Sequence, residues 1–276
     1  MDVHAVLAAI DWDVLWRRTF GEITDPDSQF WLALWRTLYI SVAAQLFGIV
    51  LGLVAALMRM SRIWPFRWLS GFYVLVFRGT PVIVQIFFVY FGANLLFGVN
   101  LIKDTNFGLF TLSAAAIAGI VALGINEGAY MREIIRAGID SIDKGQMEAA
   151  KSLGMQYRLA MRRIILPQAA RVIVPPLGNE FNNMMKTSSL IFFIGVTELF
   201  GDAEIRYSTS FQPVEYFLGV AFWYLVLTSA WTVIQAQIER KLAESERGDV
   251  VTFRERLQSA WSLRPAFRAG DARGAR

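Results

Sequence analysis

Four polar residues stand out because they lie in or beside long apolar stretches. Asn126 and Glu127 end one uncharged run, and Glu180 and Asn183 lie between two others. A charge at the centre of a bilayer costs about 2.5–3.5 kcal/mol even on the lenient insertion scale, so such groups need pairing or a wet cavity. A carboxylate can hold a cation, and an asparagine offers both donors and acceptors. The alternative is structural: Glu127 pairs with Lys186 or an arginine and locks two helices together.

Other kinds of chemistry find no support in the residue pattern. The chain has no cysteine, and its single histidine, His4, has no further candidate ligand near it. No glycine-rich loop ending in Gly-Lys-Ser/Thr occurs, so no segment is suited to cradling nucleotide phosphates. No nucleophile is grouped with a base. We therefore expect neither catalysis, nor a metal site, nor a cofactor in this chain.

The elements that position these residues are expected to be membrane helices. The chain has 276 residues, of which 55% are hydrophobic and 18% charged, more apolar surface than a soluble domain of this size can hide. A helix of about 20 apolar residues crosses a bilayer. Runs of that kind are Thr37 to Met58, Val82 to Ile102, Thr105 to Asn126 and Tyr216 to Ile238, with a divided region from Ile164 to Thr197. These runs predict an all-α integral membrane protein with about five transmembrane helices.

Two of the expected spans contain breaks. The second is predicted to break near its start at Gly79, Thr80 and Pro81, because Pro81 lacks an N–H and disfavours helical geometry at Thr80. This segment is a candidate hinge or pathway-lining kink, or equally an interfacial helix turning into the span. Pro175 and Pro176 are expected to interrupt the fourth span.

The first span has a face of small residues that would let another helix approach closely. These residues recur every fourth position and are Ala44, Gly48, Gly52 and Ala56. At the far end of the third span, Glu133 and Arg136 lie one turn apart and are expected to pair at the cytoplasmic surface.

Loop charges predict the topology. The 132–168 loop carries seven Lys and Arg and the tail after Ile238 carries nine, whereas the 103–104 and 200–213 connections carry one each. The positive-inside rule then places the N-terminus outside and the C-terminus in the cytoplasm. The expected organisation is an extracytoplasmic or interfacial segment at 1–32, a transmembrane domain at 33–240 and a mobile basic tail at 241–276.

The N-terminal segment does not resemble a signal peptide, because its apolar run is short and lacks a basic leader. An amphipathic helix at the membrane surface, with Trp12, Leu15 and Trp16 toward lipid, is one possibility. A plain packing segment is the other.

A polar stretch at 143–167 separates the third and fourth spans and is expected to form two short helices. Asp143 can cap the first, Gln146 can reach back to the cap, and Gly154 stands where a left-handed terminator belongs. The second is expected to run from Met155 to Leu166, before Pro167.

The first of these helices has the features of a docking surface. Small Ala149 and Ala150 would let a partner come close, and Glu148 and Lys151 offer charge at the rim. The alternative without a docking role is an amphipathic surface helix ended by a glycine.

The same stretch carries a family signature with fixed types at fixed spacing: Glu148, Ala149, Ala150, Gly154, Ile164, Leu166 and Pro167. It resembles the cytoplasmic EAA loop of permease subunits in ABC importers. The segments at 77–81, 128–155, 166–179, 186–190 and 194–200 are similar to the polar amino-acid branch of that family. The resemblance covers roughly residues 30–240 and implies the type I ABC importer permease fold, with residues 138–167 as an ATPase-docking loop.

Partners and cargo follow from this resemblance. It implies a second permease subunit, the same or related, cytosolic ATPase subunits that bind ATP and Mg²⁺, and an extracytoplasmic binding protein that delivers an amino acid. The setting would be the bacterial inner membrane, with lipid around the chain and no nucleic-acid partner. The placement of charged and polar groups, not the signature, makes Glu127 the candidate to hold the ammonium of the amino acid, or a basic side chain, with Asn126, Glu180 and Asn183 along the pathway.

Two other classes remain open. An ion-coupled secondary transporter would use Glu127, Glu180 and Lys186, but it would usually show inverted repeats, which five unequal spans do not display. A membrane scaffold or receptor accounts for the hydrophobicity but not for broken spans with central polar groups.

Overall fold

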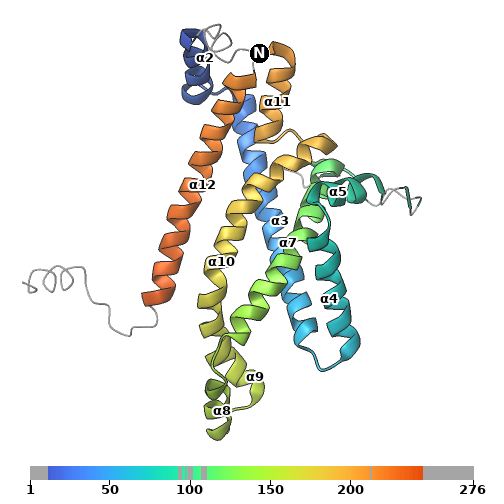
Figure 1. Cartoon of the computed structure of the whole chain (residues 1–276), viewed down its shortest axis with the longest axis vertical. Helices are drawn as coiled ribbons and strands as arrows, with labels where there is room; N and C mark the ends of the chain where they lie inside the picture. Colours follow the sequence, from blue (N-terminus) through green and yellow to red (C-terminus); the bar gives the residue numbers. More distant parts are fainter. Residues whose placement is uncertain are drawn as a thin grey trace, which may run out of the picture.

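A computed structural model describes residues 12–92, 95–96, 98, 102–106, 111–211 and 213–244. Long helices run roughly along its longest axis, with α8 and α9 at one end and α2 and α11 at the other (Figure 1). The helices are α2 Trp12–Thr24, α3 Ser28–Met60, α4 Trp64–Gly79, α5 Val82–Phe87, α7 Ala114–Asp140, α8 Lys144–Ser152, α9 Tyr157–Ala160, α10 Leu166–Thr187, α11 Leu199–Ser210 and α12 Pro213–Glu244. Two π-helical segments, η1 Phe88–Gly92 and η2 Met161–Ile165, and a 3-10 helix, η3 Ser188–Ile194, continue them.

Within the described residues, three helices are long and apolar enough to cross a membrane: α3, α7 and α12. The bent pair formed by α4 with α5 and η1 passes the same test as a fourth span. α10 has the length, with 22 residues, but it carries Arg171, Glu180 and Lys186 among its apolar positions. The expected helical membrane architecture is confirmed, with three or four candidate spans in the described residues where about five were expected.

α3 and α7 form the centre of the bundle. The expected small-residue face is confirmed, since Ala44, Gly48, Gly52 and Ala56 are all buried. A Cβ added to Gly48 would lie 2.6 Å from Cγ of Glu127 on α7, so only glycine allows this approach. In lipid the hydrophobic effect does not bring helices together, so close packing of this kind is what holds α3 against α7.

The break at Pro81 is present, but its position in the span differs from the prediction. α4 and the following helix meet at an angle of 107°, and the longer limb, Trp64–Gly79, lies before the break rather than after it. The expectation of a break near the start of the span was therefore wrong. The uncharged run after Val82 suggested the longer helix, but the continuous limb that the structure describes after the break is Val82–Gly92.

α7 also begins later than expected. Ser113 caps it by accepting a hydrogen bond from the N–H of Ala116 at 3.2 Å, and the prediction of a helix from Thr105 was wrong. Thr105–Asn106 instead pairs antiparallel with Thr111–Leu112. As a result Glu127 lies in the middle of a 27-residue helix and not near the end of a span.

α10 runs through both of its prolines, so the predicted interruption at Pro175 and Pro176 was wrong. Side chains from α12 contact its backbone at this point. Nε2 of Gln235 donates to the Pro175 carbonyl at 3.1 Å, and Nε1 of Trp231 donates to the Gly178 carbonyl at 2.8 Å. The actual change of course comes later, in the 3-10 segment that ends at Gly195 with φ of 88°.

The end of the molecule opposite α8 is held by buried and paired carboxylates. Glu198 is fully buried and accepts hydrogen bonds from Thr37 of α3 and Tyr224 of α12. Asp27 caps α3 and pairs with Arg206 of α11 at 2.7 Å. The hydrogen bond from the Phe30 N–H, followed by the interaction with Arg206, lowers the pKa of Asp27.

Of the N-terminal segment, residues 1–11 lie outside the described part of the chain. Residues 12–24 form α2, which packs beside the start of α12 (Figure 1). Thr19 of α2 is buried and Trp16 is exposed. The contact with α12 favours the packing alternative for this helix. Residues 245–276 of the expected tail also lie outside the described residues.

Candidate docking loop and transport pathway

The first helix of the docking loop, defined as residues 138–167, has the ends that the sequence predicts. Asp143 caps α8 by accepting a hydrogen bond from the Gly145 N–H at 2.6 Å. At the other end Gly154 adopts φ of 76°, and the N–H groups of Gly154 and Met155 bond back to Lys151 and Ala150. This pair of bonds is a Schellman motif, which satisfies carbonyls that the helix end leaves open. The side chain of Gln146 does not reach the cap and lies 3.5 Å from that of Gln168.

The second helix of the loop does not end before Pro167. α9 begins at Tyr157, and helical backbone continues through the π-helical η2 into α10. Pro167 lies in α10 directly after the π-helical η2. The docking loop is therefore joined to α10 by an unbroken helical path.

The seven signature residues divide into two faces. Ala150 is 1% exposed because α8 folds onto α9 and η2, so it packs within the chain instead of facing a partner. Glu148, Ala149, Gly154, Leu166 and Pro167 are exposed, and Ile164 is partly exposed. The exposed side of α8 therefore carries Glu148 and Ala149, and Gly154 is exposed just beyond its end.

The break at the candidate hinge is held by two side-chain amides. Gln85 donates from Nε2 to the Phe77 carbonyl at 2.9 Å, to the Thr80 carbonyl at 3.1 Å and to the Thr80 hydroxyl at 2.8 Å. Asn126 of α7 donates from Nδ2 to the same Phe77 carbonyl at 2.8 Å and to Oε1 of Gln85 at 3.1 Å. The carbonyls that Pro81 leaves without a helical partner are thus satisfied by protein, as a break at membrane depth requires.

Glu127 is buried between α3 and α7. Its Oε1 accepts a hydrogen bond from Nε2 of Gln45 at 3.0 Å, and the side chain is 5% exposed. Oε1 of Gln45 is buried and has no hydrogen-bond partner in the described part of the chain. Neither Lys186, which is exposed, nor an arginine among the described residues pairs with Glu127.

The four candidate pathway residues do not form one cluster. Asn126 belongs to the break and Glu127 contacts α3, whereas Glu180 is partly exposed and Asn183 fully exposed on α10. No hydrogen bond joins the α7 pair to the α10 pair among the residues that the structure describes. α7 and α10 are nevertheless neighbours in the bundle (Figure 1).

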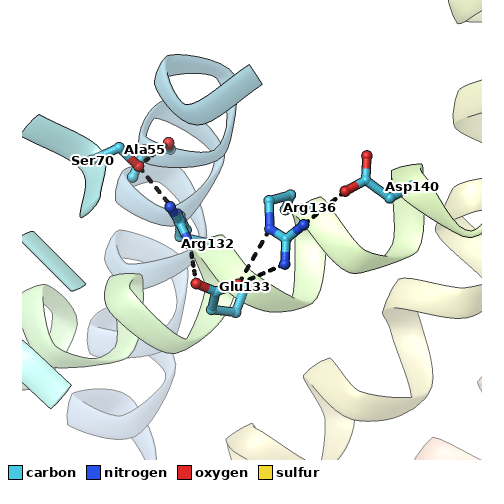
Figure 2. Close-up of polar contacts among 6 residues, drawn as sticks. All are labelled: Ala55, Ser70, Arg132, Glu133, Arg136 and Asp140. Atoms are coloured by element: carbon cyan, nitrogen blue, oxygen red, sulfur yellow. Dashed lines mark hydrogen bonds and ion pairs between the residues drawn. The ribbon is translucent and has the colours of Figure 1, made fainter. Parts of the chain in front are cut away.

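The expected Glu133–Arg136 pair is present as part of a longer chain of charges (Figure 2). Arg136 also pairs with Asp140 at 2.8 Å, and Glu133 also pairs with the neighbouring Arg132. Arg132 is buried and donates from Nε to the hydroxyl of Ser70 on α4 at 3.1 Å. That hydroxyl in turn donates to the Ala55 carbonyl of α3 at 2.7 Å.

Sequence reasoning missed Gln45, Gln85 and Arg132. The two glutamines are uncharged, and a search for charges in apolar runs passes over them, although an amide inside a span is a comparable signal. Arg132 was counted as a loop charge because a polar stretch follows it in the sequence, which suggested a position at the membrane surface. Its place one turn before Arg136 on a continuous helix shows that it belongs to the bundle.

Comparisons with known proteins identify the family. Residues 48–244 match the family model described as "Binding-protein-dependent transport system inner membrane component". The chain belongs to this family of permeases. It is 39% identical to the arginine transport system permease protein ArgU of Corynebacterium glutamicum over 85% of this chain and 73% of that protein. It is also 39% identical to the probable amino-acid permease protein YxeN of Bacillus subtilis over 76% of this chain and 90% of that protein.

Solved structures agree with this assignment. An amino acid ABC transporter solved with histidines gives a TM-score of 0.67 and 40% identity, covering 77% of this chain and 93% of that one. The MetNI methionine ABC transporter, at 19% identity and a TM-score of 0.64, shares the fold. The expected resemblance to permease subunits of polar amino-acid ABC importers is confirmed, and an ion-coupled secondary transporter is not favoured. As a family, such permeases work with ATPase and binding-protein partners.

Proposed function

We propose that this permease carries a polar amino acid into the cytoplasm and that a separate ATPase subunit, which binds ATP and Mg²⁺, drives it through the docking loop. The main support is the free face of α8, where Glu148, Ala149 and Gly154 are exposed at the end of the molecule that projects beyond the long helices (Figure 1). An arginine permease and a probable amino-acid permease among the relatives support the class of cargo.

The orientation and the assembly belong to the same proposal. The docking loop and the C-terminus of the chain lie in the cytoplasm, and the N-terminus lies outside. Arg59, Arg62 and Arg67 are exposed around the turn between α3 and α4, at the same end as α8 (Figure 1), which agrees with the positive-inside rule. A second permease subunit and an extracytoplasmic amino-acid-binding protein complete the complex in the lipid bilayer.

The docking role is tested by changes on the exposed face of α8. Ala149→Arg or Gly154→Asp should leave membrane insertion intact and abolish ATP-driven uptake, because the first adds bulk and charge to a protein interface and the second adds a charge and strains the left-handed turn at Gly154. Arg62→Glu, an equally exposed charge change outside the loop, is the matched control. Uptake and binding-protein-stimulated ATP hydrolysis are measured in vesicles with the ATPase and binding subunits. Normal values for both loop variants would falsify the docking role.

Within this function Glu127 has two alternative roles: it binds the cargo, or it locks α3 to α7. The buried hydrogen bond to Gln45 supports the locking role, and the position of Glu127 in the middle of α7 supports the cargo role. As a cargo site, Glu127 would bind the ammonium, or the basic side chain, of the amino acid. Glu127→Gln then changes the preference among cationic, neutral and acidic amino acids and weakens cargo-dependent ATP hydrolysis. As a lock between α3 and α7, the same change lowers the thermal stability of the complex and leaves the preference unaltered.

A further inference from the structure

α4 and α7 are joined along a seam of polar contacts that is unusual for two helices in an apolar setting. Ser70, Tyr73 and Phe77 fall on one face of α4, at the i, i+3, i+7 spacing of a helix. Each meets α7: Arg132 donates to the Ser70 hydroxyl, the Tyr73 hydroxyl donates to the Ile125 carbonyl, and Asn126 donates to the Phe77 carbonyl. In lipid, packing and such hydrogen bonds hold helices together.

The two ends of this seam lead to different parts of the molecule. At one end, the Phe77 carbonyl is the last contact before the 107° bend at Pro81. At the other end, Arg132 begins the chain of ion pairs through Glu133 and Arg136 to Asp140, the last residue of α7 (Figure 2).

The connection from α7 to the docking helix is short and hydrogen bonded. Ser141 ends α7 with its N–H bonded to the Ala137 carbonyl at 3.0 Å, and the Ile142 N–H bonds to the Ile139 carbonyl at 3.3 Å. Asp143 then caps α8 directly. Because this connection is short and hydrogen bonded, we expect a displacement of α8 to displace the end of α7 as well.

Arg132 is the member of the seam that also holds a third helix. Its side chain is 5% exposed, and the Ser70 hydroxyl that it contacts donates at the same time to the Ala55 carbonyl of α3. A guanidinium has several fixed donors, so one side chain can bond both Glu133 and Ser70, which an ammonium on a flexible stem does less well.

We propose that Arg132 is a positioning residue that makes α4 move together with α7, so that motion of the docking loop reaches the bend at Pro81. This inference rests on the proposed function, because it assigns a path by which ATPase docking acts on the transport pathway. It gives Asn126 a place in that path as well, at the bend end of the seam.

The transport test uses the complete complex in proteoliposomes, with its ATPase and binding protein, and measures amino acid imported per ATP hydrolysed. Arg132→Met should lower this ratio about tenfold, because it removes a charge-assisted hydrogen bond between α4 and α7. Ser70→Ala should lower the ratio about threefold. Arg132→Lys should recover part of the loss. Arg240→Gln, an exposed arginine on α12 outside the seam, is the matched control and should leave the ratio unchanged.

A second measurement follows the helices directly. The chain has no cysteine, so spin labels at Leu75→Cys on α4 and Ala137→Cys on α7, both exposed positions, are the only labels in this subunit. With wild-type Arg132 the distance between them should be the same without nucleotide and with ATP and vanadate. In Arg132→Met, or in Ser70→Ala if the first variant does not fold, the distance distribution should broaden or shift between the two states.

Several results overturn the proposal. One is an unchanged ratio with unchanged label distances in both variants. Another is a distance between α4 and α7 that already changes with nucleotide in the wild type. A third is a parallel loss of uptake, ATP hydrolysis and thermal stability at constant ratio, which means that Arg132 is merely structural. If the wild-type complex hydrolyses ATP without importing an amino acid, the proposed function fails, and the label distances still decide the role of Arg132.

Discussion

Two helical regions of this permease contain proline in an apolar setting, and only one of them is broken there. At Pro81 the chain turns by 107° between α4 and α5, whereas α10 continues through Pro175 and Pro176. Proline removes one backbone donor and disturbs the preceding turn in either case. The proline alone therefore does not explain the difference.

The difference lies in the side chains around each site. At the bend, Gln85 lies on α5 and Asn126 lies on α7. Together their side chains donate hydrogen bonds to the carbonyls of Phe77 and Thr80 in the bent geometry. Beside α10, Gln235 and Trp231 extend from α12 and bond to an unbroken helix. The Phe77 carbonyl that Pro81 releases therefore has two side-chain donors, whereas the described α12 side chains bond carbonyls of residues 175 and 178 and not those of residues 171 and 172 that the α10 prolines release.

The largest effect is expected from removing the amide that holds the bend. Gln85→Leu removes the part-buried bonds to the carbonyls of Phe77 and Thr80 and takes the acceptor from Asn126, at a cost of about 2 kcal/mol in the free energy of unfolding. Thermal unfolding of the purified complex in detergent measures it. Gln237→Leu, an exposed amide on α12, is the control. Equal midpoints for Gln85→Leu and wild type would show that the bend does not need this residue.

A change at the proline itself should affect transport more than stability. Pro81→Ala restores a backbone donor and removes a steric penalty of about 3 kcal/mol on a continuous helix, so a straight form can compete with the bend. We expect uptake to slow several-fold while the unfolding midpoint stays close to that of wild type. Pro65→Ala, in the first turn of α4 where proline is well tolerated, should alter neither. Uptake at the normal rate in Pro81→Ala would mean that the bend is only an entry turn.

Features with local causes could be predicted from the sequence. The cap at Asp143, the left-handed Gly154, the small-residue face of α3 and the Glu133–Arg136 pair each depend on residues within a few turns. Their spacing is enough to define them, because the helix geometry that brings the residues together is itself local.

Features that depend on a distant partner could not be predicted in the same way. α10 is contacted beside its prolines by Gln235, 60 residues away in the chain from the Pro175 carbonyl that it bonds. The side chain of Asn126 bonds to Phe77 and Gln85, and Glu127, whose alternative partner was Lys186 or an arginine, bonds to Gln45. A single sequence shows that a polar group in a span needs a partner, but not which helix supplies it.

A smaller effect is expected from the partner of α10. Gln235→Leu removes donors to the Pro175 carbonyl and to the Asn179 side chain, at a cost of about 1 kcal/mol in the free energy of unfolding. Uptake should be unchanged, because α10 is a continuous helix at this point. The same thermal unfolding and uptake assays apply, again with Gln237→Leu as control. A several-fold loss of uptake without loss of stability would place a moving joint in α10 as well.

The smallest effect is expected from Pro175→Ala, the counterpart of Pro81→Ala. The new N–H can form a hydrogen bond within the helix that is already present, which stabilises the folded state. Alanine also makes the unfolded chain more flexible, which lowers the free energy of unfolding by about 0.4–1 kcal/mol and offsets that gain. The bond from Gln235 goes to the carbonyl of residue 175, which alanine keeps. Stability should therefore change by less than about 0.5 kcal/mol, and uptake should equal that of wild type. The two proline variants are assayed side by side for uptake rate and unfolding midpoint. If Pro175→Ala slows uptake as much as Pro81→Ala does, both prolines serve as joints, and the distinction between a bend held by Gln85 and Asn126 and a straight helix supported by α12 is wrong.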